Sequence, residues 1–170
     1  MTYPKNHQKN ILSLLDKDQK NIRLFREGSM GTEEIKKESE NISNEFMEII
    51  NDAGFPFLNI TPSDVYEAAI VLSLHLPTSG LNNMFNKIKD SPLSTLKPEH
   101  MAYFTDKILI HSGKKQKYGT QYKINSKGGV GVLPIEDYLH VDIRRAELGL
   151  ETLEEYQNKI KREITYSLDK

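Results

Sequence analysis

The sequence predicts a mainly α-helical protein, a compact bundle of about six to seven helices with one β-hairpin at about residues 115–135. Three observations support this fold class. Apolar residues recur at helical spacing through most of the chain, glycine and proline divide that pattern into segments, and the period changes to two after Gly113. No repeat or long linker interrupts the segments, so we expect a single domain over residues 1–170.

Three helices are predicted in the N-terminal half. Residues 5–27 carry one apolar stripe, and a second amphipathic helix, capped by Thr32, ends before Gly54. The third helix, residues 65–76, follows a threonine–proline start signal and is apolar nearly all round. That pattern is typical of a central, buried helix.

The remaining helices are marked by their start and stop signals. A short helix is predicted over residues 79–90, and another runs from Pro98 to His111. Downstream, residues 137–148 have helical spacing, and a capping box of Thr152 and Glu155 begins a last helix that extends to about residue 168.

The predicted hairpin comes from alternation. In residues 115–124 the lysines alternate with Gln116, Tyr118, Thr120, Tyr122 and Ile124, which we expect on the inward face of a strand. A turn at 125–129 and a second strand at 130–135 complete the hairpin.

Composition and charge exclude several classes of function. The 23 Lys+Arg against 24 Asp+Glu give a net charge of −1, so we expect no nucleic-acid or membrane partner. Zero cysteines exclude disulfides, thiolate catalysis and iron–sulfur ligation. The longest apolar run, residues 68–76, is too short to span a bilayer, and we expect a cytoplasmic protein. The oligomeric state is left open.

Three ionisable residues occupy apolar faces. Asp18 lies at the centre of the first helix's stripe, with Gln19 and Arg23 at its edges. His75 ends the apolar third helix and is expected to be buried, and Asp106 lies among apolar residues of the fifth. Each has a structural interpretation, as part of a buried polar network, a helix-end histidine or a salt bridge.

A second group of polar residues could bind a substrate. Gln116, Tyr118, Thr120 and Gln121 belong to the predicted hairpin, and the forked donors of Arg144 and Arg145 suit a carboxylate or phosphate. Several buried polar groups on different helices are most simply explained by one shared network or one pocket.

Signature motifs of the common enzyme classes are absent. We find no GxSxG, HExxH, GxxxxGK or GxGxxG, and the five histidines have no ligand spacing. We therefore expect no redox cofactor and no metal, although a divalent ion held by His75, Asp18 and Asp106 is chemically conceivable.

Seven short pieces of the sequence form a recognisable pattern: DQKNIR (18–23), GFP (54–56), His75, AYFTDKI (102–108), QKYGTQ (116–121), PIED (134–137) and VDIRRAELGL (141–150). On these pieces the sequence resembles a family of small bacterial proteins, domain of unknown function 6624, over roughly residues 15–156. It departs from the family at Phe55, where the family has Trp, and at Leu74, where the family has Gln. The resemblance implies a shared fold and a shared polar set, and no reaction.

These residues lead to an expected function, an enzyme that modifies a small molecule or peptide by hydrolysis, elimination or group transfer. His75 would be the general acid or base, oriented by Asp18 or Asp106, in a pocket between the first, third and fifth helices. The substrate would be bound by Gln19, Arg23 and the second group of polar residues. The alternatives are a non-catalytic ligand- or protein-binding domain that uses the same pocket, and a purely structural network.

Overall fold

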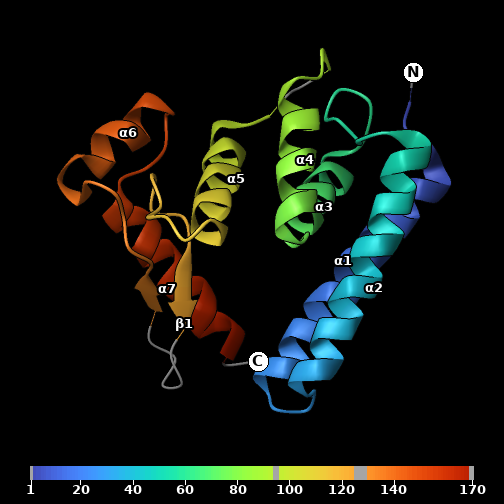
Figure 1. Cartoon of the computed structure of the whole chain (residues 1–170), viewed down its shortest axis with the longest axis horizontal. Coiled ribbons are helices and arrows are strands. Elements are labelled where there is room, and N and C mark those ends of the chain that lie inside the picture. Colours follow the sequence, from blue (N-terminus) through green and yellow to red (C-terminus); the bar gives the residue numbers. More distant parts are fainter. Residues whose placement is uncertain (1, 94–95, 125–129, 169–170) are drawn as a thin grey trace. The chain divides into compact units, whose positions relative to one another are not determined.

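A computed structural model describes residues 2–93, 96–124 and 130–168, without the side chains of residues 124, 130 and 163–168. Within these residues the chain forms seven α-helices, one 3₁₀ helix and one two-stranded hairpin, which confirms the predicted fold class (Figure 1). The chain divides into two compact units, Met1–Thr95 and Leu96–Lys170. The single domain over residues 1–170 stays a prediction.

The N-terminal unit contains four helices. They are α1 (Lys5–Arg26), α2 (Thr32–Ala53), α3 (Ser63–Leu74) and α4 (Thr78–Lys89). Helix α1 packs against α2 and α3, and α3 packs against α4 (Figure 1). The contacts follow from the apolar faces, because a helix stabilises the fold mainly by burying such a face.

Helix α3 is the centre of this unit's core, as its sequence predicts. Its residues Val65, Tyr66, Ala68 and Ala69 are at most 1% exposed. The Tyr66 ring meets Phe55 edge-on, with 6.3 Å between the ring centroids. Burial of this aromatic and aliphatic surface is the main stabilising contribution.

Three details of these helices differ from the sequence predictions. The third helix ends at Leu74, so His75 is its C-cap. Thr32 is the first residue of α2, and Gly31 is the N-cap. Phe25, which the periodicity places on the buried stripe, is 43% exposed because it lies in the last turn of α1.

The C-terminal unit begins with α5 (Pro98–His111), which starts on a proline as predicted. Strands β1 (Tyr122–Ile124) and β2 (Val130–Val132) pair antiparallel. They are followed by the 3₁₀ helix η1 (Tyr138–His140), α6 (Val141–Glu147) and α7 (Leu153–Leu168).

The capping box before α7 is confirmed. Thr152 N–H and its hydroxyl both donate to Glu155 Oε2, at 2.9 and 2.7 Å, and Glu155 N–H donates back to Thr152 Oγ1 at 3.3 Å. These bonds hold the pKa of the Glu155 carboxyl below its usual range. The reciprocal bonds satisfy donors that a helix N-terminus otherwise leaves without partners.

The hairpin is shorter than predicted. Residues 115–121 are not strand, apart from one parallel bridge between Gln116 and Ile135. The backbone N–H groups of Lys117, Tyr118 and Thr120 bond instead to a carboxylate on α5, so these three donors are not available for a sheet ladder. Tyr122, expected on the inward face, is 37% exposed, and the predicted turn at 125–129 lies outside the described residues.

The predicted helix at residues 137–148 begins later and consists of two parts, η1 and α6. Asp137 has a left-handed backbone with φ of 42°, so it is not helical itself and precedes η1 as its N-cap. Beneath this region Ile135, Val141 and Leu153 form a small apolar core, against which Val132 packs.

Candidate functional site

The eleven positions proposed from the sequence fall into two groups. Four lie in the N-terminal unit and seven in the C-terminal unit, where the structure adds an eighth. The single pocket expected to join them stays a prediction. The first group is Asp18, Gln19, Arg23 and His75, and the second is Asp106, Lys107, Gln116, Tyr118, Thr120, Gln121, Arg144 and Arg145, in which Lys107 is added by the structure.

Asp18 and His75 form a hydrogen-bonded pair. Asp18 comes from α1 and is 5% exposed, and its Oδ2 lies 2.9 Å from Nδ1 of His75 at the end of α3. Gln19 Nε2 donates to the same oxygen at 2.9 Å. A carboxylate in this position needs donors, because an unpaired buried charge costs several kcal/mol, roughly 3–5 kcal/mol when a partner is removed.

The imidazole of His75 is more exposed than expected, with 35% of its side-chain surface accessible. It is exposed because residue 75 follows the last turn of α3 and does not lie inside the helix. An ionised carboxylate can only accept a hydrogen bond, so next to it a neutral imidazole carries its proton on Nδ1 and its lone pair on Nε2. Within the described residues Nε2 has no hydrogen-bond partner.

Two further residues of α1 complete the surroundings of this pair. Asn21, one turn after Asp18, is 7% exposed, and its Nδ2 has no hydrogen-bond partner in the part of the chain that the structure describes. The sequence reasoning missed Asn21, although the three-residue spacing from Asp18 places both on one helix face. Arg23 is exposed, and its guanidinium makes no hydrogen bond or ion pair with any described residue.

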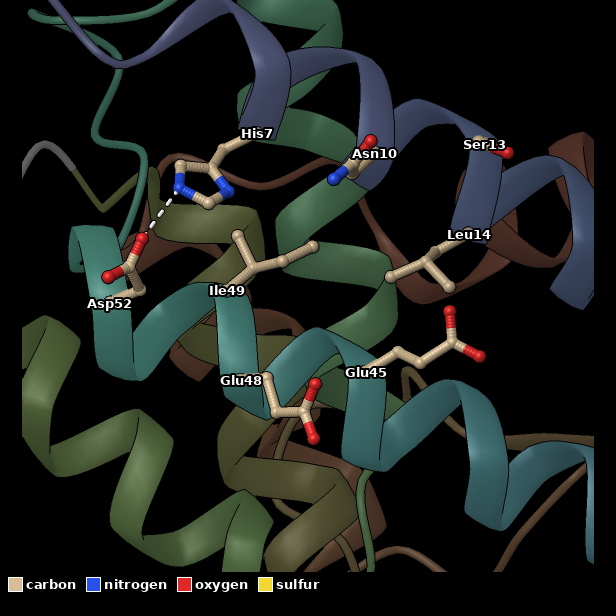
Figure 2. A pocket seen from close by; sticks show the side chains of 8 residues that line it. All are labelled: His7, Asn10, Ser13, Leu14, Glu45, Glu48, Ile49 and Asp52. Atoms are coloured by element: carbon tan, nitrogen blue, oxygen red, sulfur yellow. Dashed lines mark hydrogen bonds and ion pairs between the residues drawn. The ribbon is translucent and has the colours of Figure 1, made fainter.

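A separate cavity of about 470 Å³ opens along α1 and α2 (Figure 2). At one end His7 Nε2 lies 2.8 Å from Asp52 Oδ2, and the acidic side chains of Glu45 and Glu48 line its α2 wall. His7 Nδ1 is buried and has no partner among the described residues. The sequence reasoning did not single out His7, because the five histidines have no ligand spacing, and its pairing with Asp52 is visible only in the fold.

In the C-terminal unit Asp106 is fully buried and bonds to the segment that follows α5. Its Oδ1 accepts the N–H of Lys117 at 2.7 Å and of Tyr118 at 3.0 Å. Its Oδ2 accepts the N–H and the hydroxyl of Thr120, both at 2.9 Å. The carboxylate therefore holds the QKYGTQ turn through hydrogen bonds rather than through the salt bridge considered from the sequence.

The two glutamines of this turn are bonded differently. Gln116 is fully buried, and its amide bonds the backbone of Gln121 in both directions, at 2.9 and 2.8 Å, and the carbonyl oxygen of Leu133 at 2.7 Å. Gln121 is half-buried and donates to Thr120 Oγ1 at 3.1 Å. The Tyr118 hydroxyl makes no hydrogen bond within the described chain, so Tyr118 and Gln121 have polar atoms left for a ligand.

Arg144 and Arg145 point in different directions, as expected for neighbours on a helix. Arg145 is 2% exposed and donates to the carbonyl oxygens of Glu151 and Tyr118, both at 2.7 Å. Arg144 donates to the carbonyl oxygens of Lys117 at 2.9 Å and Glu136 at 2.6 Å. Both guanidinium groups thus bond to backbone of the same unit, where they fix the QKYGTQ and PIED segments.

Lys107, next to Asp106 on α5, has a shifted ionisation. Burial lowers the pKa of its ammonium group. Burial and the Lys107 charge, in that order, lower the pKa of His111 one turn further along α5. The sequence contains no signal for this shift, because the burial of a lysine depends on tertiary packing.

Neither a metal cluster nor a membrane span was found in the described residues. No group of three or more His, Asp and Glu side chains there has an arrangement that could hold an ion. None of the described helices combines the length and apolar character required to cross a bilayer.

Comparison with known proteins gives one match. The model of a family described as "Family of unknown function (DUF6624)" matches residues 45–169. The matched range contains His75 and the whole QKYGTQ turn, whereas the DQKNIR segment with Asp18 precedes it. Neither a curated protein nor a solved structure matches the chain significantly.

Proposed function

Since the chain belongs to DUF6624, a family of unknown function, we propose its function from the geometry alone: an enzyme that uses His75 for acid–base chemistry on a small molecule or peptide. The proposal rests on the 2.9 Å contact between His75 Nδ1 and the buried Asp18 carboxylate. A carboxylate that orients an exposed imidazole is the arrangement used by histidine general bases.

The two residues have different roles in the proposed reaction. In hydrolysis or group transfer, Nε2 of His75 takes a proton from a water or a substrate hydroxyl as that oxygen attacks; in elimination, it takes the proton from the carbon next to the one that bears the leaving group. In each case the imidazolium then gives the proton to the leaving group. Asp18 is the positioning residue: it accepts the Nδ1 proton and stabilises the imidazolium that forms. The reaction is hydrolysis, elimination or group transfer, and it requires no redox cofactor.

The surroundings of the pair support this assignment of roles. The bond from Gln19 to Asp18 Oδ2 keeps the carboxylate in one orientation. Arg23, exposed on the same helix, supplies a cation for an anionic end of the substrate. A cytoplasmic location also stays a prediction.

A first test of the proposal needs no substrate. Diethyl pyrocarbonate acylates unprotonated imidazole nitrogens, and mass spectrometry of the digested protein gives the rate at each histidine. We expect His75 to react faster than His140. The buried carboxylate of Asp18 should hold the imidazole proton on Nδ1 of His75 more firmly than the carboxylate of Asp137, which is 54% exposed, does for His140. We also expect Asp18→Asn to slow the reaction at His75 severalfold, because the amide no longer favours the Nε2 lone pair. Equal rates in wild type and Asp18→Asn would contradict the proposed role of Asp18.

The second test is activity against a panel of aryl esters and aminoacyl anilides. His75→Ala should lose about 10²–10⁴-fold in kcat/KM, the usual contribution of a general base. Imidazole added to His75→Ala should restore part of the activity, which no structural role of the side chain would explain. His140→Ala is the matched control, because it removes a second imidazole that is paired with a carboxylate. Full activity of folded His75→Ala would overturn the proposal.

The cavity between α1 and α2 favours a second candidate function, binding of a small cationic molecule. Its volume of about 470 Å³ lies in the range of ligand pockets, roughly 300–1,000 Å³. Glu45, Glu48 and Asp52 on its wall would attract a cation. Titration with spermidine, followed by calorimetry, tests this candidate: Glu48→Gln should weaken binding, whereas His75→Ala should leave it unchanged.

A further inference from the structure

Large apolar side chains are exposed together on the C-terminal unit. Leu139 in η1 is 88% exposed, Tyr138 beside it 61%, and Ile143 in α6 59%. They are the three most exposed large apolar residues that the structure describes. Neighbouring exposed apolar side chains of this size mark an interaction surface more often than isolated ones do.

A cavity of about 520 Å³ lies beside these side chains. Tyr138 and Leu139 line one side of it, and Val141 and Leu153, each 3% exposed, provide its apolar part. The opposite wall is one face of α7, on which residues 154, 157, 158 and 161 follow at helical spacing. A protruding leucine and a cavity that could hold one thus lie on the same surface.

The segment that carries Leu139 is held in a fixed conformation. Asp137 has a φ of 42°, which is strained for a residue other than glycine. His140 Nδ1 lies 2.8 Å from the Asp137 carboxylate, and Arg144 Nη2 donates to the Asp137 carbonyl oxygen at 3.1 Å. Because these contacts already order the segment, little conformational entropy is lost when Leu139 is buried in a partner.

The charges along the α7 face indicate which partner fits. Glu154 and Lys161 line the same cavity seven residues apart, with opposite charges at the two ends of the face. Between them lie Gln157 and Asn158, whose amides both donate and accept hydrogen bonds. A second copy of this face, turned antiparallel, places each Glu154 opposite the other copy's Lys161. Such a surface is complementary to itself.

We propose that this surface is the interface of a two-fold symmetric homodimer, in which Leu139 of each copy occupies the cavity between η1 and α7 of the other. The proposal concerns assembly and is independent of the reaction assigned to His75. A partner of another sequence would need a protruding apolar side chain for the cavity and charges that match Glu154 and Lys161. A second copy already has all of these.

The test is sedimentation equilibrium of the full chain over a wide range of concentration. Wild type should be dimeric, and Leu139→Asp should raise the dimer Kd by at least tenfold while its circular dichroism spectrum stays that of the wild type. The fold should tolerate the change because the side chain is almost fully exposed. Leu93→Asp, at a 43% exposed leucine of the N-terminal unit, is the control and should remain dimeric.

Charge reversal tests the antiparallel arrangement. Glu154→Lys alone should weaken the dimer, and the double variant Glu154→Lys/Lys161→Glu should regain affinity, because the pair is then reversed on both copies. Failure of the double variant to regain affinity overturns this arrangement. A wild type that is monomeric at every concentration, or a dimer that Leu139→Asp does not weaken, overturns the interface as a whole.

Discussion

Asp106 accepts both the backbone N–H and the side-chain hydroxyl of Thr120, each at 2.9 Å. The same carboxylate binds the N–H groups of Lys117 and Tyr118. A single side chain on α5 therefore satisfies three backbone donors of the turn, which no sheet partner satisfies. This arrangement explains why the QKYGTQ segment is irregular although its sequence alternates like a strand.

The first prediction concerns this carboxylate. Asp106→Asn should lower the free energy of unfolding by about 3–5 kcal/mol, because the amide offers one acceptor oxygen and turns an NH₂ group toward N–H donors. Urea unfolding measures the loss. Asp90→Asn, at an exposed aspartate, should change stability by less than about 0.5 kcal/mol. A similarly small effect at Asp106 would show that the turn is held by other contacts.

Gly119 occupies the tightest place in the same turn. Its φ is +76°, and a Cβ built there would lie 2.6 Å from Leu153 Cδ1. Gly119→Ala should therefore destabilise the protein by about 2–5 kcal/mol, from left-handed strain and overpacking together. Gly131→Ala is the matched control, since its Cβ would meet nothing within 4 Å. Equal midpoints of thermal unfolding for the two variants would contradict this explanation.

The helices could be predicted from the sequence because each is encoded locally. The apolar character of α3 on nearly all sides and the capping box of Thr152 depend on residues within a few positions of one another, and both are confirmed. The QKYGTQ turn could not be predicted in the same way. Its conformation depends on a carboxylate more than ten residues away, and alternation alone cannot distinguish a strand from a turn whose donors are satisfied by a side chain.

The candidate site was partly predictable for a related reason. A charged residue in the middle of an apolar stripe must find a partner, which pointed to Asp18. The identity of the partner and the exposure of His75 depend on how α1 and α3 cross, which no local pattern encodes. For the same reason the pairing of His7 with Asp52 was missed.

The third prediction compares how much the adjacent residues Arg144 and Arg145 contribute to the free energy of unfolding. Arg145→Lys should cost about 2–4 kcal/mol, because an ammonium group cannot reach both carbonyl oxygens or stack on Tyr156, whose ring centroid lies 4.9 Å from Cζ. Arg144→Lys, at a half-buried position, should cost about 1 kcal/mol or less. Chemical denaturation of both variants measures the difference, and the reverse order would contradict the assignment of Arg145 as the buried anchor.

The fourth prediction concerns Lys107. Its folded pKa is lowered by burial, so below that pKa the charged form destabilises the fold, and the penalty disappears as the pH rises toward the unfolded value of 10.5. Lys107→Met should therefore stabilise the protein at neutral pH, by an amount that shrinks in alkali.

The pKa of His111 gives an independent measurement of the charge on Lys107. Removing the Lys107 ammonium should raise the pKa of His111 toward its usual value, although burial will still hold it below. NMR titration of the His111 ring protons follows this change. Lys115→Met, which removes an exposed lysine, should not change the pKa of His111. An unchanged titration in Lys107→Met would show that the two side chains do not interact.

The last prediction distinguishes a structural from a catalytic role of the Asp18–His75 pair. Stability is measured for Asp18→Asn, His75→Ala and the double variant, which gives the coupling free energy of the pair. If the pair holds α1 to α3, each single change should cost about 2–4 kcal/mol, because a buried group loses its partner, and the coupling should exceed about 1 kcal/mol.

If the pair is kept for catalysis, we expect small or favourable changes in stability together with the loss of activity, since residues that serve a reaction are often not optimal for the fold. The exposed imidazole favours the second outcome, because a purely structural contact needs only the Nδ1 side of the ring.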